Sequence, residues 1–210
     1  MVNEQNERTT KDKILESAAD LFAEKGFTET SIRELAESIG LNSASLYHHF
    51  PTKNSILECM LEDYSAYNTD VFEERNVGQI LRDNPTSDGV MACLQTEFHP
   101  DRKEYSLKVL CVLLQEQLRN PIARDFISEH IIMRAERNFS KVFNELKSLG
   151  VIKQDADPDY WMKATSGFFY VFAIRMMLGI GDNAPDFTGR GMFEMLRSTF
   201  DIMFEKDGIH

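Results

Sequence analysis

Apolar residues recur three and four positions apart along almost the whole chain, and this spacing predicts an all-α protein. A first helix is expected over residues 11–25, with Thr9 or Thr10 as its N-cap and Gly26 ending it in the left-handed conformation. The apolar face of this helix comprises Ile14, Leu15, Ala18, Ala19, Leu21 and Phe22.

Three further helices are expected directly after the first. The second starts near Thr30, where Ser31 and Glu34 have capping-box spacing. Gly40 provides the turn after the second helix, and Asn42 or Ser43 caps the third. Pro51 ends the third helix and Thr52 caps the fourth. The third helix is therefore short and ends at Phe50.

Beyond about residue 70 the pattern changes to longer helices with looser connections. Helices are expected over residues 104–119, 121–149, 158–178 and 192–205, with loops at 84–89 and 179–191. All six prolines fall at these predicted boundaries, which supports the all-α interpretation. We expect two domains: an N-terminal three-helix domain over residues 8–54 and a larger helical domain over residues 55–210.

Helix, glycine turn and short helix form the helix-turn-helix pattern that reads the major groove of DNA. In the second of these helices, residues 42–50, Leu46 and Phe50 are four positions apart and are expected to face inward. They would pack against Ile32, Leu35 and Ile39. The residues left pointing outward are Ser43, Ala44, Ser45, Tyr47 and His48.

This outward face has the chemistry that base recognition needs. Small Ser and Ala side chains let the backbone approach base edges, and the Ala44 methyl group can contact a thymine methyl group. Tyr47, His49 and Lys53 are suited to phosphate oxygens, as are the amide groups at the starts of the second and fourth helices.

The net charge of −11 argues against a protein that coats DNA indiscriminately. The first 60 residues contain six Lys and Arg against ten Asp and Glu, so this half is itself acidic. Residues 38–57 nevertheless contain no acidic side chain, and they include His48, His49 and Lys53. A local binding patch is therefore compatible with the overall charge.

The segment over residues 29–57, ETSIRELAESIGLNSASLYHHFPTKNSIL, resembles the N-terminal segment of the TetR (tetracycline-repressor) family of bacterial transcriptional regulators. The resemblance is carried by Thr30 to Ala36, by Gly40 and by the run from Leu46 to Lys53. Residues 14–27 match as well, so that the likeness covers roughly residues 9–60. Farther along, such families share only their helical character.

The resemblance implies a homodimer whose paired reading heads grip a palindromic operator on double-stranded DNA. It also implies a small-molecule effector that enters the C-terminal domain, moves the fourth helix and releases the DNA. The DNA-contacting residues implied are Ser31, Arg33, Ser43, Ala44, Ser45, Tyr47, His48, His49 and Lys53. We therefore expect a repressor, although an activator or a regulator without an effector would use the same reading head.

An excess of Phe and Met in the C-terminal half suits an adaptable apolar pocket, although ordinary core is the default for each residue. The candidate pocket residues are Phe126, His130, Met133, Phe168, Phe169, Phe172 and Met176. The helix over 158–178 is apolar on more than one face, which indicates either a dimer interface or the central helix of a monomer. The candidate interface residues are Phe168, Val171, Met192, Phe193, Leu196, Phe200 and Met203.

Other function classes have little support. The start of the chain is polar, and the apolar stretch from residue 161 to 180 contains Lys163 and Arg175, so we expect a cytoplasmic protein with no membrane partner. The three cysteines are dispersed, which favours buried thiols over a disulfide, a zinc site or a redox sensor. Adjacent His48 and His49 favour phosphate contact or exposure over a metal site.

Catalytic motifs are absent from the sequence, so we expect neither an enzyme nor a cofactor. The remaining alternative is a helical enzyme or binding module whose helix-turn-helix is incidental. Such a protein would have no reason to keep residues 43–49 small and free of acidic side chains.

Overall fold

The computed structural model describes residues 9–67, 76–94, 100–177 and 190–209, and gives only the backbone for residues 67, 100, 168–177 and 190–193. Within these ranges the protein is helical, as predicted, and the sole β-pairing is an isolated bridge between Ile152 and Gly208. None of the helices in the described ranges is both long and apolar enough to cross a lipid bilayer.

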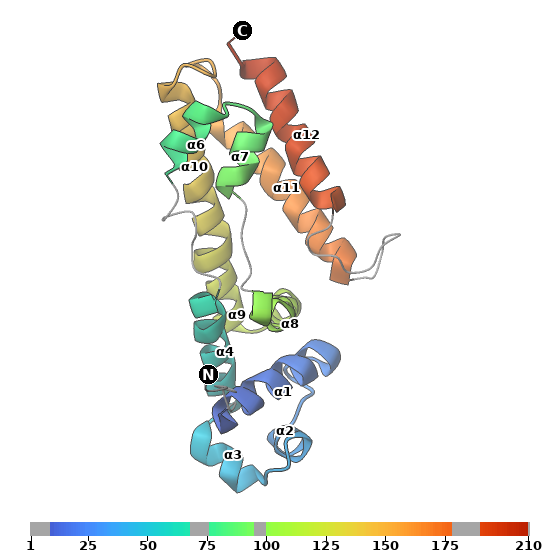
Figure 1. Ribbon diagram of the computed structural model, residues 1–210. Helices are drawn as coiled ribbons and strands as arrows, with labels where there is room; N and C mark the ends of the chain where they lie inside the picture. The colour runs from blue at the N-terminus through green and yellow to red at the C-terminus, as the bar shows by residue number, and fades with distance from the viewer. Residues whose placement is uncertain (1–8, 68–75, 95–99, 178–189, 210) are drawn as a thin grey trace, which may run out of the picture. The chain divides into compact units, whose positions relative to one another are not determined.

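The helices gather into two compact units, each formed by two separate stretches of chain (Figure 1). Unit 1 comprises residues 1–69 and 98–129, and unit 2 comprises residues 70–97 and 130–210. The helices of unit 1 are α1 (Thr10–Lys25), α2 (Ile32–Ser38), α3 (Ser43–His49), α4 (Lys53–Tyr67), η1 (Pro100–Arg102), α8 (Lys103–Glu116) and α9 (Pro121–Phe126). The helices of unit 2 are α6 (Val77–Asp83), α7 (Ser87–Leu94), α10 (Met133–Ser148), α11 (Pro158–Met177) and α12 (Arg190–Asp207).

This division by packing differs from the functional boundary expected after residue 54. Helix α4 packs with α1 and α8 in unit 1, and α8 also lies against α1. Functional domains need not coincide with packing units, so the boundary between residues 54 and 55 stays a prediction.

The predicted caps set the start of each helix in the reading segment. Thr9 and Asp12 form a capping box at the start of α1, with the Asp12 amide donating to the Thr9 hydroxyl at 3.1 Å. Ser31 and Asn42 cap α2 and α3 by accepting hydrogen bonds from amides three residues later. Gly26 has the expected positive φ of 92°, but its ψ of 151° is extended, so the residue is not in the left-handed helical conformation predicted.

The core of unit 1 forms where α1, α4 and α8 meet. Helix α1 contributes Ile14, Ala18 and Phe22 with no measurable exposure, and α8 crosses above them. Two polar contacts fix the α1–α8 pairing: the Lys108 ammonium lies 2.6 Å from Asp20, and the Gln115 amide donates to the Ala23 carbonyl. The other fully buried residues of this core include Ile56, Leu57, Met60, Val109, Val112 and Leu113.

Unit 2 has a separate core around the aromatic residues of α10 and α12. The Phe139 and Phe200 rings stack with centroids 6.3 Å apart, and Phe143 lies beside them. Helices α7, α11 and α12 lie side by side (Figure 1). The C-terminal end is tied in by a 2.7 Å hydrogen bond from the indole of Trp161 to the carboxylate of Asp207.

Two predicted elements differ from the structure. The loop expected over residues 84–89 ends at residue 86, because α7 already begins at Ser87. This tight turn requires Gly89, where a Cβ atom would lie 1.9 Å from the Asn84 carbonyl oxygen. The single helix expected over 121–149 contains a π-helical segment, η2 (Ile127–Ile132), between α9 and α10.

Candidate DNA-binding interface

Helices α2 and α3 form a helix-turn-helix around a small apolar centre. Leu35 and Leu46 are completely buried and Phe50 is nearly so, which confirms the inward face predicted for α3. The turn between the helices is closed by a 2.8 Å hydrogen bond from the Leu41 amide to the Ala36 carbonyl, with Gly40 at a φ of 72°. Leu46 is the one buried residue within α3, so the position of this helix depends on that side chain.

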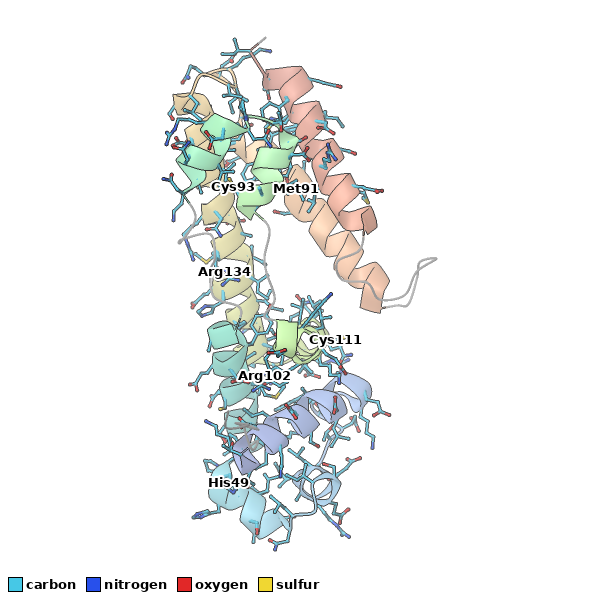
Figure 2. All side chains as sticks on the ribbon, viewed as in Figure 1. His49, Met91, Cys93, Arg102, Cys111 and Arg134 are labelled. Atoms are coloured by element: carbon cyan, nitrogen blue, oxygen red, sulfur yellow. The ribbon has the colours of Figure 1, made fainter. Side chains whose placement is uncertain are left out.

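The outward face of α3 carries the side chains predicted to read DNA. Ala44, Tyr47, His48 and His49 are exposed, and Ser43 and Ser45 are half-buried. Tyr47 is 50% exposed although it is a large aromatic residue, and His49, labelled in Figure 2, is the last residue of the helix. This exposed strip of polar and aromatic groups contains no carboxylate.

Ser31 and Arg33, predicted along the DNA backbone, are also exposed, but both have intramolecular partners. The Ser31 hydroxyl caps α2 by accepting from the Glu34 amide at 3.1 Å. The Arg33 guanidinium pairs with Glu37 one helical turn away, with 2.7 Å between Nε and Oε1. This hydrogen bond raises the pKa of Arg33 and places a carboxylate beside the cation that was predicted to meet phosphate.

Lys53 is the predicted contact whose position differs most from expectation. Its ammonium does not stand on the outward face but donates to the carbonyls of Phe27, Thr28 and Thr30 at 2.7, 3.2 and 3.0 Å. It also lies 4.6 Å from the centre of the Phe27 ring. The acceptors are backbone atoms more than twenty positions away, so no sequence motif reveals them.

Further contacts fix α2 on α1. The buried hydroxyl of Thr30 lies within hydrogen-bonding distance of the carbonyls of Gly26 and Leu21, at 2.9 and 3.2 Å. The hydroxyls of Ser17 and Ser38 lie 2.6 Å apart, and Lys25 pairs with Glu34. The helix-turn-helix is thus held in a defined orientation within unit 1.

A partly buried polar cluster, not recognised from the sequence, joins α1, α4 and α8. The Arg102 guanidinium (labelled in Figure 2) lies 3.3 Å from Glu16 and 3.8 Å from Asp63. It also sits over the Tyr105 ring, 5.2 Å from its centre. Burial raises the pKa of Asp63 despite the nearby cation. Burial and the Asp63 carboxylate together raise the pKa of the Tyr105 hydroxyl. Sequence periodicity assigned such acidic residues to solvated helix faces.

The predicted effector-pocket residues whose side chains are described fall in both units. Phe126 makes an edge contact with Tyr64 in unit 1, with ring centres 6.0 Å apart. His130 and Met133 belong to unit 2 and are both exposed. The side chains of the other candidates lie outside the described part of the chain: Phe168, Phe169, Phe172 and Met176.

The dimer-interface prediction requires a correction on α12. Phe200 and Met203 are each 1% exposed and belong to the core of unit 2, with Leu196 packed against them. The exposed apolar residues of this helix are instead Met195 and Ile202. Periodicity shows that a helix has two apolar sides but not which side faces its own core. The side chains of Phe168, Val171, Met192 and Phe193 lie outside the described residues.

Comparison with known proteins identifies the same segment. Residues 14–60 match the family model for bacterial regulatory proteins of the tetR family. The chain is 43% identical over 54 residues to the transcriptional repressor KstR2 of Mycolicibacterium smegmatis, covering 26% of each chain. It is 48% identical over 48 residues to IcaR of Staphylococcus aureus, a negative transcriptional regulator of the biofilm operon icaADBC, covering 23% of this chain and 26% of IcaR.

The matched segment spans about a quarter of the length of these curated relatives, which are regulators rather than enzymes. The fold is similar over almost the whole chain to that of a transcriptional regulator from Saccharomonospora viridis solved in complex with choline. That likeness has a TM-score of 0.60 at 20% identity and covers 95% of this chain and 98% of the other. The N-terminal segment thus matches the tetR family of bacterial regulatory proteins over residues 14–60, and the fold of the whole chain is similar to that of a solved transcriptional regulator.

Proposed function

We propose that this protein is a cytoplasmic, sequence-specific DNA-binding regulator that represses transcription from a palindromic operator. The observation that carries the proposal is the outward face of α3, which is exposed, free of carboxylates and anchored from beneath by Leu46. An α-helix with such a face fits the major groove. The matched relatives, a repressor and a negative regulator, support the direction of control.

The DNA contacts divide by chemistry. Ser43, Ala44, Ser45 and His48 stand at the base edges, where small side chains and hydroxyls permit close approach. Tyr47 and His49 contact phosphate oxygens or bases.

Ser31, the cap of α2, and Arg33, within α2, lie along the flanking backbone of the duplex. Arg33 reaches phosphate only by releasing or sharing Glu37, so its contribution to affinity is reduced.

A palindromic operator requires a symmetric pair of reading heads, which we propose is supplied by a homodimer. On α12 the exposed Met195 and Ile202 are seven residues apart and therefore lie along one side of the helix. This side, rather than the one carrying Phe200, is the proposed seam. Ile202→Glu should shift the protein toward monomer in analytical ultracentrifugation without unfolding unit 2, and an unchanged dimer would refute this seam.

A small-molecule effector that releases the DNA completes the proposal. The structural neighbour solved with choline binds a small molecule on a similar fold, and the Phe- and Met-rich C-terminal half of this chain suits an apolar pocket. Once the operator duplex is known, this part of the proposal is tested by measuring DNA affinity in the presence of each compound of a broad library. At least one compound should weaken DNA binding, and a library in which none does so would contradict the proposed effector.

The first experiment is selection from a random pool of duplex DNA at about 150 mM salt, where sequence-independent binding is weak. Enrichment of a palindrome with half-sites about one helical turn apart is expected. Ala44→Glu should abolish it, because the new carboxylate stands on the exposed face of α3 without disturbing the core. Leu118→Glu adds the same charge at an 89% exposed site off that face and should bind normally. No enrichment by folded, dimeric protein would overturn the proposal.

A further inference from the structure

The Lys53 ammonium joins the two ends of the helix-turn-helix. Its three acceptors, the carbonyls of Phe27, Thr28 and Thr30, lie immediately before Ser31, the cap of α2. Lys53 itself is the first residue of α4, shortly after α3 ends at His49. One side chain therefore connects the segment that enters the two reading helices with the segment that leaves them.

The hydrogen-bonding capacity of this ammonium is fully used by these contacts. A lysine ammonium has three N–H groups, and three carbonyl oxygens lie within 3.2 Å of it. The face of the buried Phe27 ring lies on a further side, 4.6 Å away. A phosphate oxygen could bind this ammonium only by displacing one of these partners.

Lys53 is only partly exposed to solvent. Burial lowers its pKa, while the carboxylates of Glu116 and Glu29 act in the opposite direction. Of these two carboxylates, Glu116 at the end of α8 is 6% exposed, whereas Glu29 is exposed.

We propose that Lys53 is a positioning residue of the reading head and not a DNA contact. Its ammonium gathers the carbonyls that end the α1–α2 connection and thereby sets the orientation of α2, and with it α3, relative to α4. The proposal rests on the proposed DNA-binding function. It gives Lys53 the same role as Thr30, which is 1% exposed and whose hydroxyl lies beside the Gly26 carbonyl of the same connection and the Leu21 carbonyl of α1.

Positioning and direct phosphate contact differ in the salt dependence of binding. A lost phosphate contact reduces the slope of log K against log salt by about 0.9. A lost positioning contact weakens binding but leaves the number of neutralised phosphates, and hence the slope, unchanged. We expect Lys53→Met to weaken binding by about tenfold or more, because several charge-assisted hydrogen bonds are lost at once.

The test uses the full-length protein and the duplex enriched by the wild type from the random pool. Lys53→Met keeps the apolar stem over Phe27 but removes the donors. Thr30→Val removes the buried hydroxyl without changing shape, and Lys13→Met removes one charge from the exposed face of α1. We expect the first two variants to lose affinity at an unchanged slope, and the third to match the wild type.

Hydrogen exchange of the protein without DNA supplies an independent readout. In Lys53→Met and Thr30→Val the amides of α2 should exchange faster than in the wild type, while Lys13→Met should not differ. If Lys53→Met does not fold, Lys53→Gln replaces it, because the glutamine amide keeps two hydrogen-bond donors. The amide exchange rates of α2 in Lys53→Gln should fall between those of Thr30→Val and those of the wild type.

The outcomes separate this proposal from the proposed function. A slope reduced by about 0.9 for each reading head, with normal exchange in α2, would show that Lys53 binds phosphate and would overturn the positioning role. Wild-type affinity in Lys53→Met would overturn it as well. If the wild type enriches no duplex, the proposed function fails, and the exchange of α2 still decides whether Lys53 positions it.

Discussion

Leu46→Ala should release the reading helix from unit 1 while leaving the rest of the protein folded. Helix α3 has seven residues, far fewer than an isolated helix needs to be stable in water. Leu46 is its one buried residue and is 0% exposed. The helix therefore depends on this side chain, which anchors it where α3 packs against α2.

The cost of the substitution can be worked from this burial. Truncation to alanine removes three carbon atoms, and at about 0.8 kcal/mol for each buried methylene the lost transfer free energy is about 2.4 kcal/mol. The cavity left behind increases the total to about 3–5 kcal/mol, because a rigid site collapses only partly. A loss of about 3 kcal/mol raises the population of the open state by more than about 100-fold.

Hydrogen exchange at the amides of α3 and denaturant unfolding measure this effect together. Protection should fall in α3, and DNA binding should be lost, while the fluorescence of Trp161 in unit 2 keeps its native maximum at low denaturant. Leu118→Ala is the matched control, since it deletes the same atoms from a side chain that is 89% exposed. Unchanged protection of α3 in Leu46→Ala would show that the helix is held by other contacts and would refute the reasoning.

Three individual interactions lead to further predictions. Glu37→Ala should free Arg33 for phosphate, giving tighter DNA binding and a salt slope steeper by about 0.9 for each additional phosphate neutralised; unchanged binding would place Arg33 away from the DNA. Folding raises the pKa of Asp63, so the folded state holds this proton more tightly than the unfolded state does. The free energy of unfolding of the wild type, relative to that of Asp63→Asn, should therefore fall as the pH rises from about 4 toward 7. A difference in urea unfolding that does not change with pH would contradict this. Asp207→Ala should cost about 1–3 kcal/mol and red-shift the emission of Trp161, whose buried indole N–H loses its acceptor, whereas Asp207→Asn keeps a carbonyl oxygen and should cost less.

The elements that could be predicted from the sequence are those set by local chemistry. Thr9, Ser31 and Asn42 have the side chains of helix caps and bind the amides that such caps bind. The inward face of α3 follows from the four-residue spacing of Leu46 and Phe50, and both are buried. Short-range rules decided these features because the partners lie within a few residues of one another.

The features that could not be predicted depend on distant partners. Lys53 is an exposed phosphate ligand by its motif, but its ammonium binds carbonyls 23 to 26 positions away. Phe200 has the apolar spacing of an interface residue, yet its ring stacks on Phe139 within unit 2. Arg102 and Asp63 meet only because α8 returns to α4. Periodicity records which side of a helix is apolar but not what covers it.

The construction of unit 1 from two separated stretches of chain has a consequence for synthesis and for engineering. Helix α8 covers α1 and α4 with side chains such as Val109 and Leu113 that are completely buried. A ribosome must therefore release residues well beyond 100 before the N-terminal helices acquire their full cover, so the reading head matures late although it is translated first. For the same reason, a chimaera that joins residues 1–54 to the C-terminal domain of another regulator changes the DNA specificity but also removes α8, the helix that packs on α1. Chimaeras joined at that boundary need the α8 surface carried across or redesigned to match.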